Sequence, residues 1–232
     1  SQSISFFSLI KKVRRVSVSW VEGDFNYSRL NNIAASKANG EVLLLLNNDI
    51  ESIKVGWFEE MLTHALRPEI GCVGAKLLYP DGRLQHGGVI VGLGAGAGHS
   101  HKYAQGGSRG YAGQLSVARN STAVTAACMM VRKQVYIAAG GLDELNLQVA
   151  FNDVDFCLRV EKIGYLNFWT PFAELYHHES ASRGSDEATT QKKERSSREI
   201  LGLRNRWNLR SFSDNNYNSN LTNWSEQFWF GI

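Results

Sequence analysis

Short apolar runs alternate along this chain with stretches whose apolar residues have helical spacing. Val42 to Leu46 is a run of five aliphatic residues, which predicts a strand buried on both faces, because a half-exposed strand would alternate apolar and polar residues. Before it, Ser28 is the expected N-cap of a helix that Asn39-Gly40 ends. The order strand, helix, strand predicts an α/β domain.

The rest of the chain continues this alternation. The further strands that we expect are Val13 to Val21, Ile70 to Tyr79, Arg83 to Val91, Ala123 to Arg132, Tyr165 to Trp169 and Ala173 to Tyr176. The further helices that we expect cover Val55 to Leu66, Val135 to Ala139 and Asn152 to about Lys162. Gly92 to Asn120 is rich in glycine and contains His99 and His101, which predicts a mobile surface loop. A lid or binding loop and plain disorder are both open interpretations of this loop.

Composition excludes several classes of protein. The chain has 232 residues, of which 43% are hydrophobic and 20% charged, as is ordinary for a soluble globular domain. A net charge of +3 without a compact basic run argues against a nucleic-acid partner. No apolar run approaches the ~20 residues of a membrane span, and no signal peptide is visible. Because Cys72, Cys128 and Cys157 are widely spaced in apolar surroundings, we expect reduced core cysteines and a cytoplasmic location. Residue 1 is Ser rather than Met, as in a fragment or a processed chain.

A polar cluster follows the aliphatic run directly. Asn47, Asn48 and Asp49 stand where a buried strand leaves the sheet, and ligands of open α/β sheets bind at that edge. Asp49 is therefore a candidate ligand-binding carboxylate. The alternative is that the cluster only caps the next helix or forms a turn.

A second acidic cluster begins the helix predicted from Asn152. Asp153 and Asp155 both lie in its first turn, where the helix dipole favours negative charge. They either stabilise the helix start alone, or one of them lies at the mouth of a pocket as a general base that takes a proton from a hydroxyl.

Two adjacent histidines close the last predicted strand. His177 and His178, followed by Glu179, are candidate metal ligands, since imidazole binds several divalent ions. Together with Asp49, a histidine here would hold one cation and leave coordination sites open for phosphate oxygens, as magnesium and manganese sites do.

Several short motifs occur together and in order along the chain. They are Ala38-Asn-Gly-Glu, the Leu-Leu-Asn-Asn-Asp that ends at Asp49, Trp57, Gly71-Cys-Val-Gly-Ala-Lys-Leu-Leu-Tyr-Pro-Asp-Gly, Gln85-His-Gly-Gly, Thr125-Ala-Ala-Cys, Gly140-Gly-Leu-Asp-Glu, Asn152-Asp-Val-Asp-Phe-Cys-Leu-Arg and Tyr176-His-His-Glu-Ser-Ala-Ser-Arg-Gly. In this combination the chain resembles family 2 glycosyltransferases with the GT-A fold, of the bacterial kind that builds rhamnose-containing or other cell-surface polysaccharides. The resemblance covers roughly Val13 to Trp207 and implies a mixed, mainly parallel sheet flanked by helices.

The resemblance implies roles for particular residues. Asp49 matches the last acid of the family's Asp-X-Asp position, which binds Mg or Mn on the nucleotide diphosphate, while Asn47 replaces the first acid. Asp153 matches the catalytic base, although Asn152 stands where Glu is frequent. His177 matches the histidine that completes the metal site, with His178 as the alternative. The residues that the resemblance implies for donor binding are Asn32, Asn47, Asn48, His86 and Asp155.

The resemblance also implies a reaction and its partners. A single inverting displacement would move a sugar from a nucleotide-diphosphate sugar to a glycan or lipid-linked acceptor. Peripheral membrane association at the inner face and a homo-oligomer are open. A non-catalytic binding module, or an inactive fragment of such a transferase, is the alternative. A nucleotidyltransferase is disfavoured because no Gly-rich phosphate loop precedes the acidic motif.

One departure from the family concerns the start of the chain. The first two β/α units, which hold the nucleobase in the family, are not visible, so residues 1–205 are expected to form an N-terminally truncated GT-A-like domain. We expect the strands at Val13 to Val21 and Val42 to Leu46 to pair directly, or another chain to fill the gap between them. Residues 206–232 form an aromatic-rich tail that either packs on the domain or stacks on sugar rings or a partner.

Overall fold

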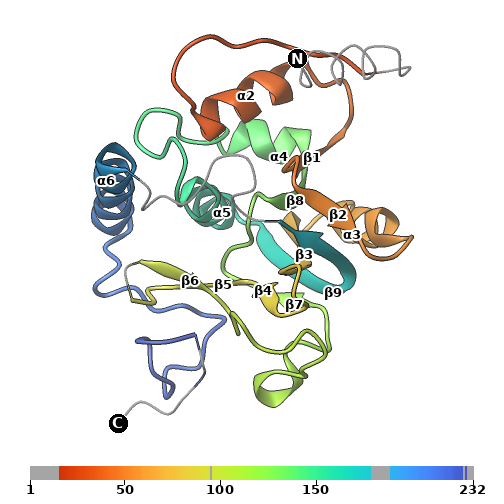
Figure 1. Cartoon of the computed structure of the whole chain (residues 1–232), viewed down its shortest axis with the longest axis vertical. Coiled ribbons are helices and arrows are strands. Elements are labelled where there is room, and N and C mark those ends of the chain that lie inside the picture. The colour runs from red at the N-terminus through yellow and green to blue at the C-terminus, as the bar shows by residue number, and fades with distance from the viewer. Residues whose placement is uncertain (1–15, 95, 179–188, 227, 229–232) are drawn as a thin grey trace.

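A computed structural model of the chain describes residues 16–94, 96–178, 189–226 and 228 (Figure 1). The helices are α2 (Tyr27–Lys37), α3 (Trp57–Ala65), the 3-10 helix η1 (Tyr111–Gly113), α4 (Lys133–Ala138), α5 (Asn152–Lys162) and α6 (Thr190–Trp207). The strands are β1 (Val42–Leu46), β2 (Ile50–Ser52), β3 (Ile70–Leu78), β4 (Leu84–His86), β5 (Val89–Val91), β6 (Ala97–His99), β7 (Arg119–Asn120), β8 (Cys128–Arg132) and β9 (Leu166–His177).

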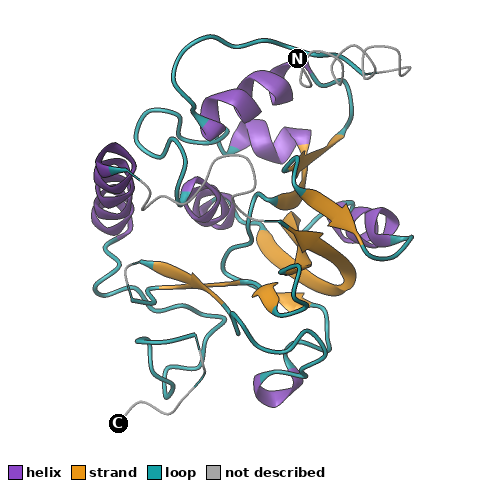
Figure 2. Cartoon of the chain, viewed as in Figure 1, coloured by secondary structure: helices purple, strands orange, loops and turns teal. Residues whose placement is uncertain are grey.

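One mixed sheet forms the centre of the domain. Its strands follow the order β1-β8-β3-β9-β2, with β4 added beside β3 and β7 beside β9, while β5 and β6 form a separate hairpin. The predicted α/β class with a mixed sheet flanked by helices is confirmed, and Figure 2 shows helices on both sides of the strands. The sheet has fewer parallel pairings than expected, because among the described strands only β3 and β9 run parallel.

Alternate residues of the central strands supply two cores. On β8, Met129 and Val131 face the core that contains residues of α2, α4 and α5, whereas Cys128 and Met130 face the core built on α3. This period of two is what a strand covered on both faces requires. The same alternation holds in β1, but Val42 and Leu44 are only partly buried, because β1 has a described partner strand on one side only.

The predicted helices and buried cysteines are largely confirmed, with changes at the helix starts. Asn26, not Ser28, caps α2: its side chain accepts a hydrogen bond from the Arg29 amide, while Ser28 is buried in the first turn. Phe151 rather than Asn152 precedes the first residue of α5. The three cysteines are buried and unbridged, as expected. In the described ranges, no helix has both the length and the apolar character needed to cross a bilayer.

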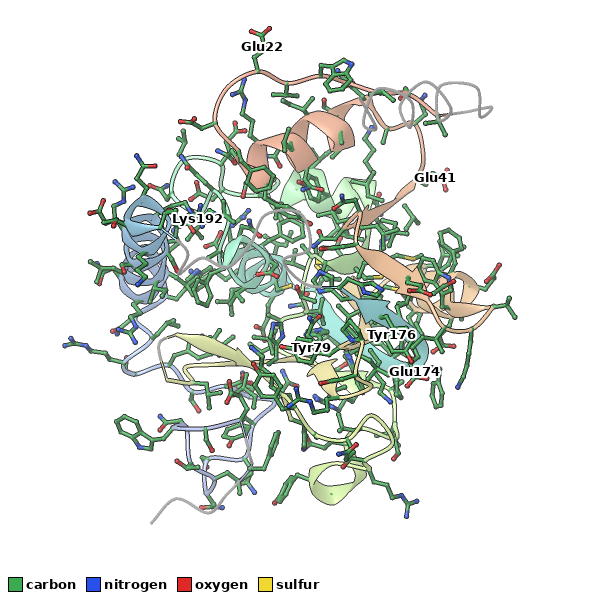
Figure 3. The ribbon with its side chains drawn as sticks, viewed as in Figure 1. Glu22, Glu41, Tyr79, Glu174, Tyr176 and Lys192 are labelled. Atoms are coloured by element: carbon green, nitrogen blue, oxygen red, sulfur yellow. The ribbon has the colours of Figure 1, made fainter. Side chains whose placement is uncertain are left out.

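The strand expected over Val13 to Val21 is wrong for the residues that the structure describes, which begin at Val16. This segment runs outside α2 without strand pairing, and Figure 3 shows Glu22 at its end pointing away from the molecule. Val16 and Trp20 are 43% and 71% exposed. Their side chains favour strands, but in the described part of the chain they neither pair with a strand nor pack in a core. Direct pairing with β1 is therefore also wrong, whereas filling of that edge by another chain stays a prediction.

Gly92 to Asn120 is only in part the surface loop that was expected, because most of its described residues are at least partly exposed but some are buried. It contributes β6, η1 and β7, and it buries Ser100, His101 and Leu115. Polar contacts replace the missing aliphatic residues: Nδ1 of His101 lies 2.7 Å from the Ser100 hydroxyl, and Nε2 accepts a hydrogen bond from the Tyr111 amide. Hydropathy alone does not detect this kind of packing.

The C-terminal part combines an unexpected helix with a packed tail. The helix α6 has a mainly polar surface and buries only Glu199 and Leu203, so it gives little apolar periodicity. In the tail, Leu221 and Phe228 are buried, which supports packing on the domain, whereas Trp224 is 87% exposed. Glu179, Trp229 and Phe230 lie outside the described residues.

Candidate functional site

A cavity of about 980 Å³ opens beside the ends of β1 and β9 and the start of α5. Its lining includes Asp49, Asp153 and His177, which the sequence had singled out from distant parts of the chain. Asn47, Asn48 and Asn152 line it as well. The fold thus brings the polar end of a buried strand, the first turn of a helix and a terminal histidine to one hollow, where open α/β sheets hold their ligands.

Strand pairing places Asp49 beside His177. After β1 the chain turns through Asn47 and Asn48 and returns as β2, which pairs antiparallel with the end of β9, so that Ile50 lies opposite His177. The backbone amide of His178 donates to the Asp49 carbonyl at 2.9 Å. As a result, Oδ1 of Asp49 lies 3.2 Å from Nε2 of His177.

Two neighbours set the protonation of the His177 ring. Nδ1 lies 2.6 Å from the amide oxygen of Gln85 on β4, and an amide oxygen only accepts hydrogen bonds, so Nδ1 carries the proton. Nε2 then holds a lone pair, which can accept from the side-chain amide of Asn47 at 3.3 Å. Fixing the tautomer through the second ring nitrogen is the usual way in which proteins orient a metal-ligating histidine.

The Asp49 and His177 pair fits a divalent cation. Oδ1 of Asp49 is buried and accepts no hydrogen bond from the residues that the structure describes. A carboxylate oxygen and an imidazole lone pair that face each other at 3.2 Å would repel unless a positive charge lay near both. The described residues offer no cluster of three or more acidic, histidine or cysteine ligands, so substrate oxygens and water would complete the coordination, as in open magnesium or manganese sites.

Asp153 also lines the cavity, in the first turn of α5. Its carboxylate accepts hydrogen bonds from the backbone amides of Ala126 at 3.1 Å and Val154 at 2.8 Å. Burial raises the pKa of Asp153 above its usual 3.8, against the opposing effect of these hydrogen bonds and of Thr125. An oriented carboxylate with a raised pKa is suited to take a proton from a bound hydroxyl.

The segment before Asp153 is held from α6. Glu199, which is 2% exposed, accepts hydrogen bonds from the amides of Val149 at 3.1 Å and Ala150 at 2.8 Å. The next residue, Phe151, has a left-handed backbone with φ of 58°, which costs a residue other than glycine about 1 kcal/mol. Strain of this kind persists where surrounding contacts enforce it, and here it lies in the cavity wall. No local pattern in the sequence indicated that Glu199 holds this segment.

Four further predicted residues are not among those that line the cavity. Asn32 bonds Tyr136 and Leu142 through its side chain. The side chain of His178 is partly exposed, and its Nε2 lies 2.9 Å from the carboxylate of Glu51. Asp155 and His86 are fully buried.

Asp155 and His86 each contact groups away from the cavity lining. The Asp155 carboxylate accepts hydrogen bonds from Arg159, Arg206 and Trp207. His86 lies behind the cavity wall, with Nδ1 2.9 Å from Nδ1 of His99. His99 itself lines the cavity, although its glycine-rich surroundings had predicted a surface loop.

Sequence comparison links the chain to larger bacterial proteins, while no family model matches it. It is 50% identical over 208 residues to the protein y4gI of Sinorhizobium fredii, covering 90% of this chain and 23% of the relative. It is 42% identical over 174 residues to the O-antigen biosynthesis protein RfbC of Myxococcus xanthus, covering 75% of this chain and 14% of the relative. The chain thus spans less than a quarter of the length of either relative.

A shorter match involves an enzyme with a named reaction. Over 66 residues, or 28% of this chain and 21% of the relative, the chain is 35% identical to an N-acetylglucosaminyl-diphospho-decaprenol L-rhamnosyltransferase of Mycobacterium tuberculosis.

Solved structures identify the fold. GalNAc-T7 with UDP, GalNAc and Mn²⁺ matches with a TM-score of 0.61 at 14% identity, over 89% of this chain and 39% of that one. The mannosyltransferase PcManGT of Pyrobaculum calidifontis, in complex with GDP-Man and Mn²⁺, matches with a TM-score of 0.52 at 12% identity, over 86% of this chain and 47% of that one. The chain therefore has the GT-A fold of these glycosyltransferases, and its sequence is similar to proteins of O-antigen biosynthesis and rhamnosyl transfer.

Proposed function

We propose that this chain is the catalytic domain of a family 2 glycosyltransferase in the synthesis of a cell-surface polysaccharide. It would transfer a sugar, with inversion, from a nucleotide-diphosphate sugar to a glycan or lipid-linked acceptor. The observation that carries the proposal is that one cavity is lined both by the Asp49 and His177 pair and by Asp153. The names of the relatives and the GT-A fold support the same class of activity.

In this proposal, Asp153 is the general base. Its carboxylate takes the proton of the acceptor hydroxyl while that oxygen bonds to the anomeric carbon and the bond from that carbon to the diphosphate oxygen breaks. The amides of Ala126 and Val154 hold the carboxylate in position for this transfer. Because attack and departure occur on opposite faces of the carbon, the configuration inverts.

Asp49 and His177 would hold a divalent cation, either Mg or Mn. When bound, such an ion supplies positive charge that offsets the negative charge developing on the departing diphosphate. The protein's own part is to present the two ligand atoms, which Gln85 and the pairing of β2 with β9 orient. The Mn²⁺ in both structural neighbours is consistent with a metal of this kind.

Replacement of the proposed base tests the mechanism. Calorimetry with Mn²⁺ and a panel of UDP, GDP and dTDP sugars would first identify a donor. The Asp153→Asn protein should then bind this donor as tightly as the wild type but transfer sugar at least 100-fold more slowly. Glu161→Gln, near the far end of the same helix, is the matched control and should retain activity. Equal transfer rates for Asp153→Asn and wild type would remove the base assignment.

A module that binds a glycan without transferring sugar is the second candidate. It is favoured by the edge position of β1, which pairs only with β8 among the described strands. The same calorimetry separates the two candidates. No heat from any nucleotide sugar, with binding of an oligosaccharide, would support the binding module and contradict the transferase.

A further inference from the structure

A second pair of histidines lies beside the proposed metal site. The T-shaped rings of His86 and His99 approach with their Nδ1 atoms 2.9 Å apart. His86 belongs to β4 and is fully buried, and His99 ends β6 in the cavity wall. Neither ring is used in the mechanism proposed above.

The hydrogen bonds of this pair run in one direction. The backbone amide of Thr125 can only donate, and it lies 3.4 Å from Nε2 of His86, so Nε2 accepts and Nδ1 of His86 carries the proton. Nδ1 of His86 then donates to Nδ1 of His99. A neutral His99 must consequently carry its proton on Nε2, as an N–H donor.

The donor of His99 lies on the open side of the ring. Nε2 of His99 has no hydrogen-bond partner among the described residues. It is not one of their buried, unpartnered polar atoms, so it is accessible from the cavity that His99 lines. If His99 were protonated, its Nδ1–H would face the Nδ1–H of His86, and this contact between two donors opposes a positive charge on the His99 ring. Burial, and then the charges of Lys102 and His177, lower the pKa of His99 from 6.5 to about 4.

The surroundings of His99 favour an anion as its partner. The cationic side chain that acts on His99 is Lys102, whose charge opposes a positive charge on the ring. A neutral N–H donor near positive charge is suited to a phosphate oxygen, and a hydrogen bond to a charged group is stronger than one to a neutral group. We propose that His99 donates its Nε2–H to a phosphate oxygen of a nucleoside diphosphate in the cavity.

Adjacent residues of β4 then give two histidines opposite roles. Gln85 accepts from Nδ1 of His177 and leaves a lone pair on Nε2, whereas His86 donates to Nδ1 of His99 and leaves an N–H on Nε2. Successive side chains of a strand point to opposite faces, so Gln85 and His86 can each contact a different histidine ring. The inference rests on the proposed function, since it places a diphosphate in the cavity.

Calorimetry on the chain with the magnesium complexes of UDP, GDP, dTDP and pyrophosphate tests the contact. His99→Phe should weaken binding by about tenfold or more, the effect of losing one hydrogen bond to a charged group. His99→Gln keeps an N–H donor and should recover most of this loss, which separates the donor role from packing. His64→Gln, on α3 and outside the cavity lining, should bind as the wild type does.

Nitrogen-15 NMR of the histidine rings tests the tautomer independently. At neutral pH, His99 should carry its proton on Nε2, and its signal should shift on addition of the magnesium diphosphates. A proton on Nδ1 of His99, or equal affinities for His99→Phe and wild type, would overturn the inference and leave the proposed function standing. If the wild type bound none of these anions and no nucleotide sugar, both would fall together.

Discussion

Replacing Asp155 by alanine should destabilise the fold rather than remove a substrate contact. This carboxylate has no exposed surface and accepts hydrogen bonds, each of 2.9 Å, from Arg159, Arg206 and Trp207. Arg159 lies on α5 with Asp155, and the other two lie on α6, which also carries Glu199. The carboxylate therefore connects α5, whose first turn contains the proposed base, to α6, which holds the segment before that base.

The size of the effect follows from burial. Removing one partner of a buried ion pair costs about 3–5 kcal/mol. Here Arg159 would lose its acidic partner, whereas Arg206 would keep Asp143. In a chain of this size, each kcal/mol shifts the melting temperature by about 2–4 °C, so Asp155→Ala should melt about 6–20 °C below the wild type.

Thermal unfolding followed by circular dichroism measures the shift. Asp81→Ala is the matched control, because Asp81 pairs with Arg83 and their side chains are 49% and 47% exposed. Its unfolding free energy should change by no more than about 0.5 kcal/mol. If Asp155→Ala melted within about 2 °C of the wild type but lost affinity for nucleotide sugars, Asp155 would be a donor ligand, as the resemblance implied, and the structural argument would be refuted.

Three further predictions concern Gly71, Asp143 and Gln85. Gly71→Ala should lose about 1–3 kcal/mol of unfolding free energy in urea, because the new methyl group would overlap Val160 and lie 3.0 Å from Cβ of Tyr165. Gly202→Ala is the control: its methyl group meets open space in α6, so its unfolding free energy should rise by up to ~1 kcal/mol. Burial opposes ionisation of Asp143, but hydrogen bonds from Asn146, Arg206 and Leu145 outweigh this effect and lower its pKa from 3.8 to about 2. The carboxylate therefore stabilises the fold above pH 3.8, and this contribution is lost as the pH falls toward 2. Asp143→Asn should reduce the dependence of the unfolding free energy on pH over this range. Gln85→Leu should weaken Mn²⁺ binding by about 10–100-fold in calorimetry without nucleotide, because His177 loses the group that fixes its tautomer, and unchanged affinity would contradict the orienting role.

Local sequence signals were sufficient where one segment determines its own position. The aliphatic run before Asp49 and the acidic first turn containing Asp153 each predicted an element and the end at which its polar residue lies. Both ends open on the same cavity because the edges of an α/β sheet gather strand and helix ends. The motif resemblance favoured His177 over His178, a choice that the strand pattern alone could not make.

Residues whose partners lie far away in sequence could not be assigned in this way. Asp153 and Asp155 occupy the same helical turn and give the same local signal, yet the second meets Arg206, 51 residues further on. Val16 and Trp20 have strand-forming side chains, but a strand needs a partner that their local pattern cannot supply. His99 lies among glycines with no apolar period, so only its contact with His86 distinguishes it from a surface residue.

The histidines of the cavity show why residue type alone leaves the chemistry of a site undetermined. His177 and His99 have the same side chain, and each has its Nδ1 against a residue of β4. An amide oxygen behind one ring leaves a lone pair toward Asp49, whereas a donating imidazole behind the other leaves an N–H toward the cavity. Since a cation needs the first and a phosphate oxygen the second, the order Gln85-His86 matters: exchanging the two residues would keep the composition of β4 but remove both orienting contacts.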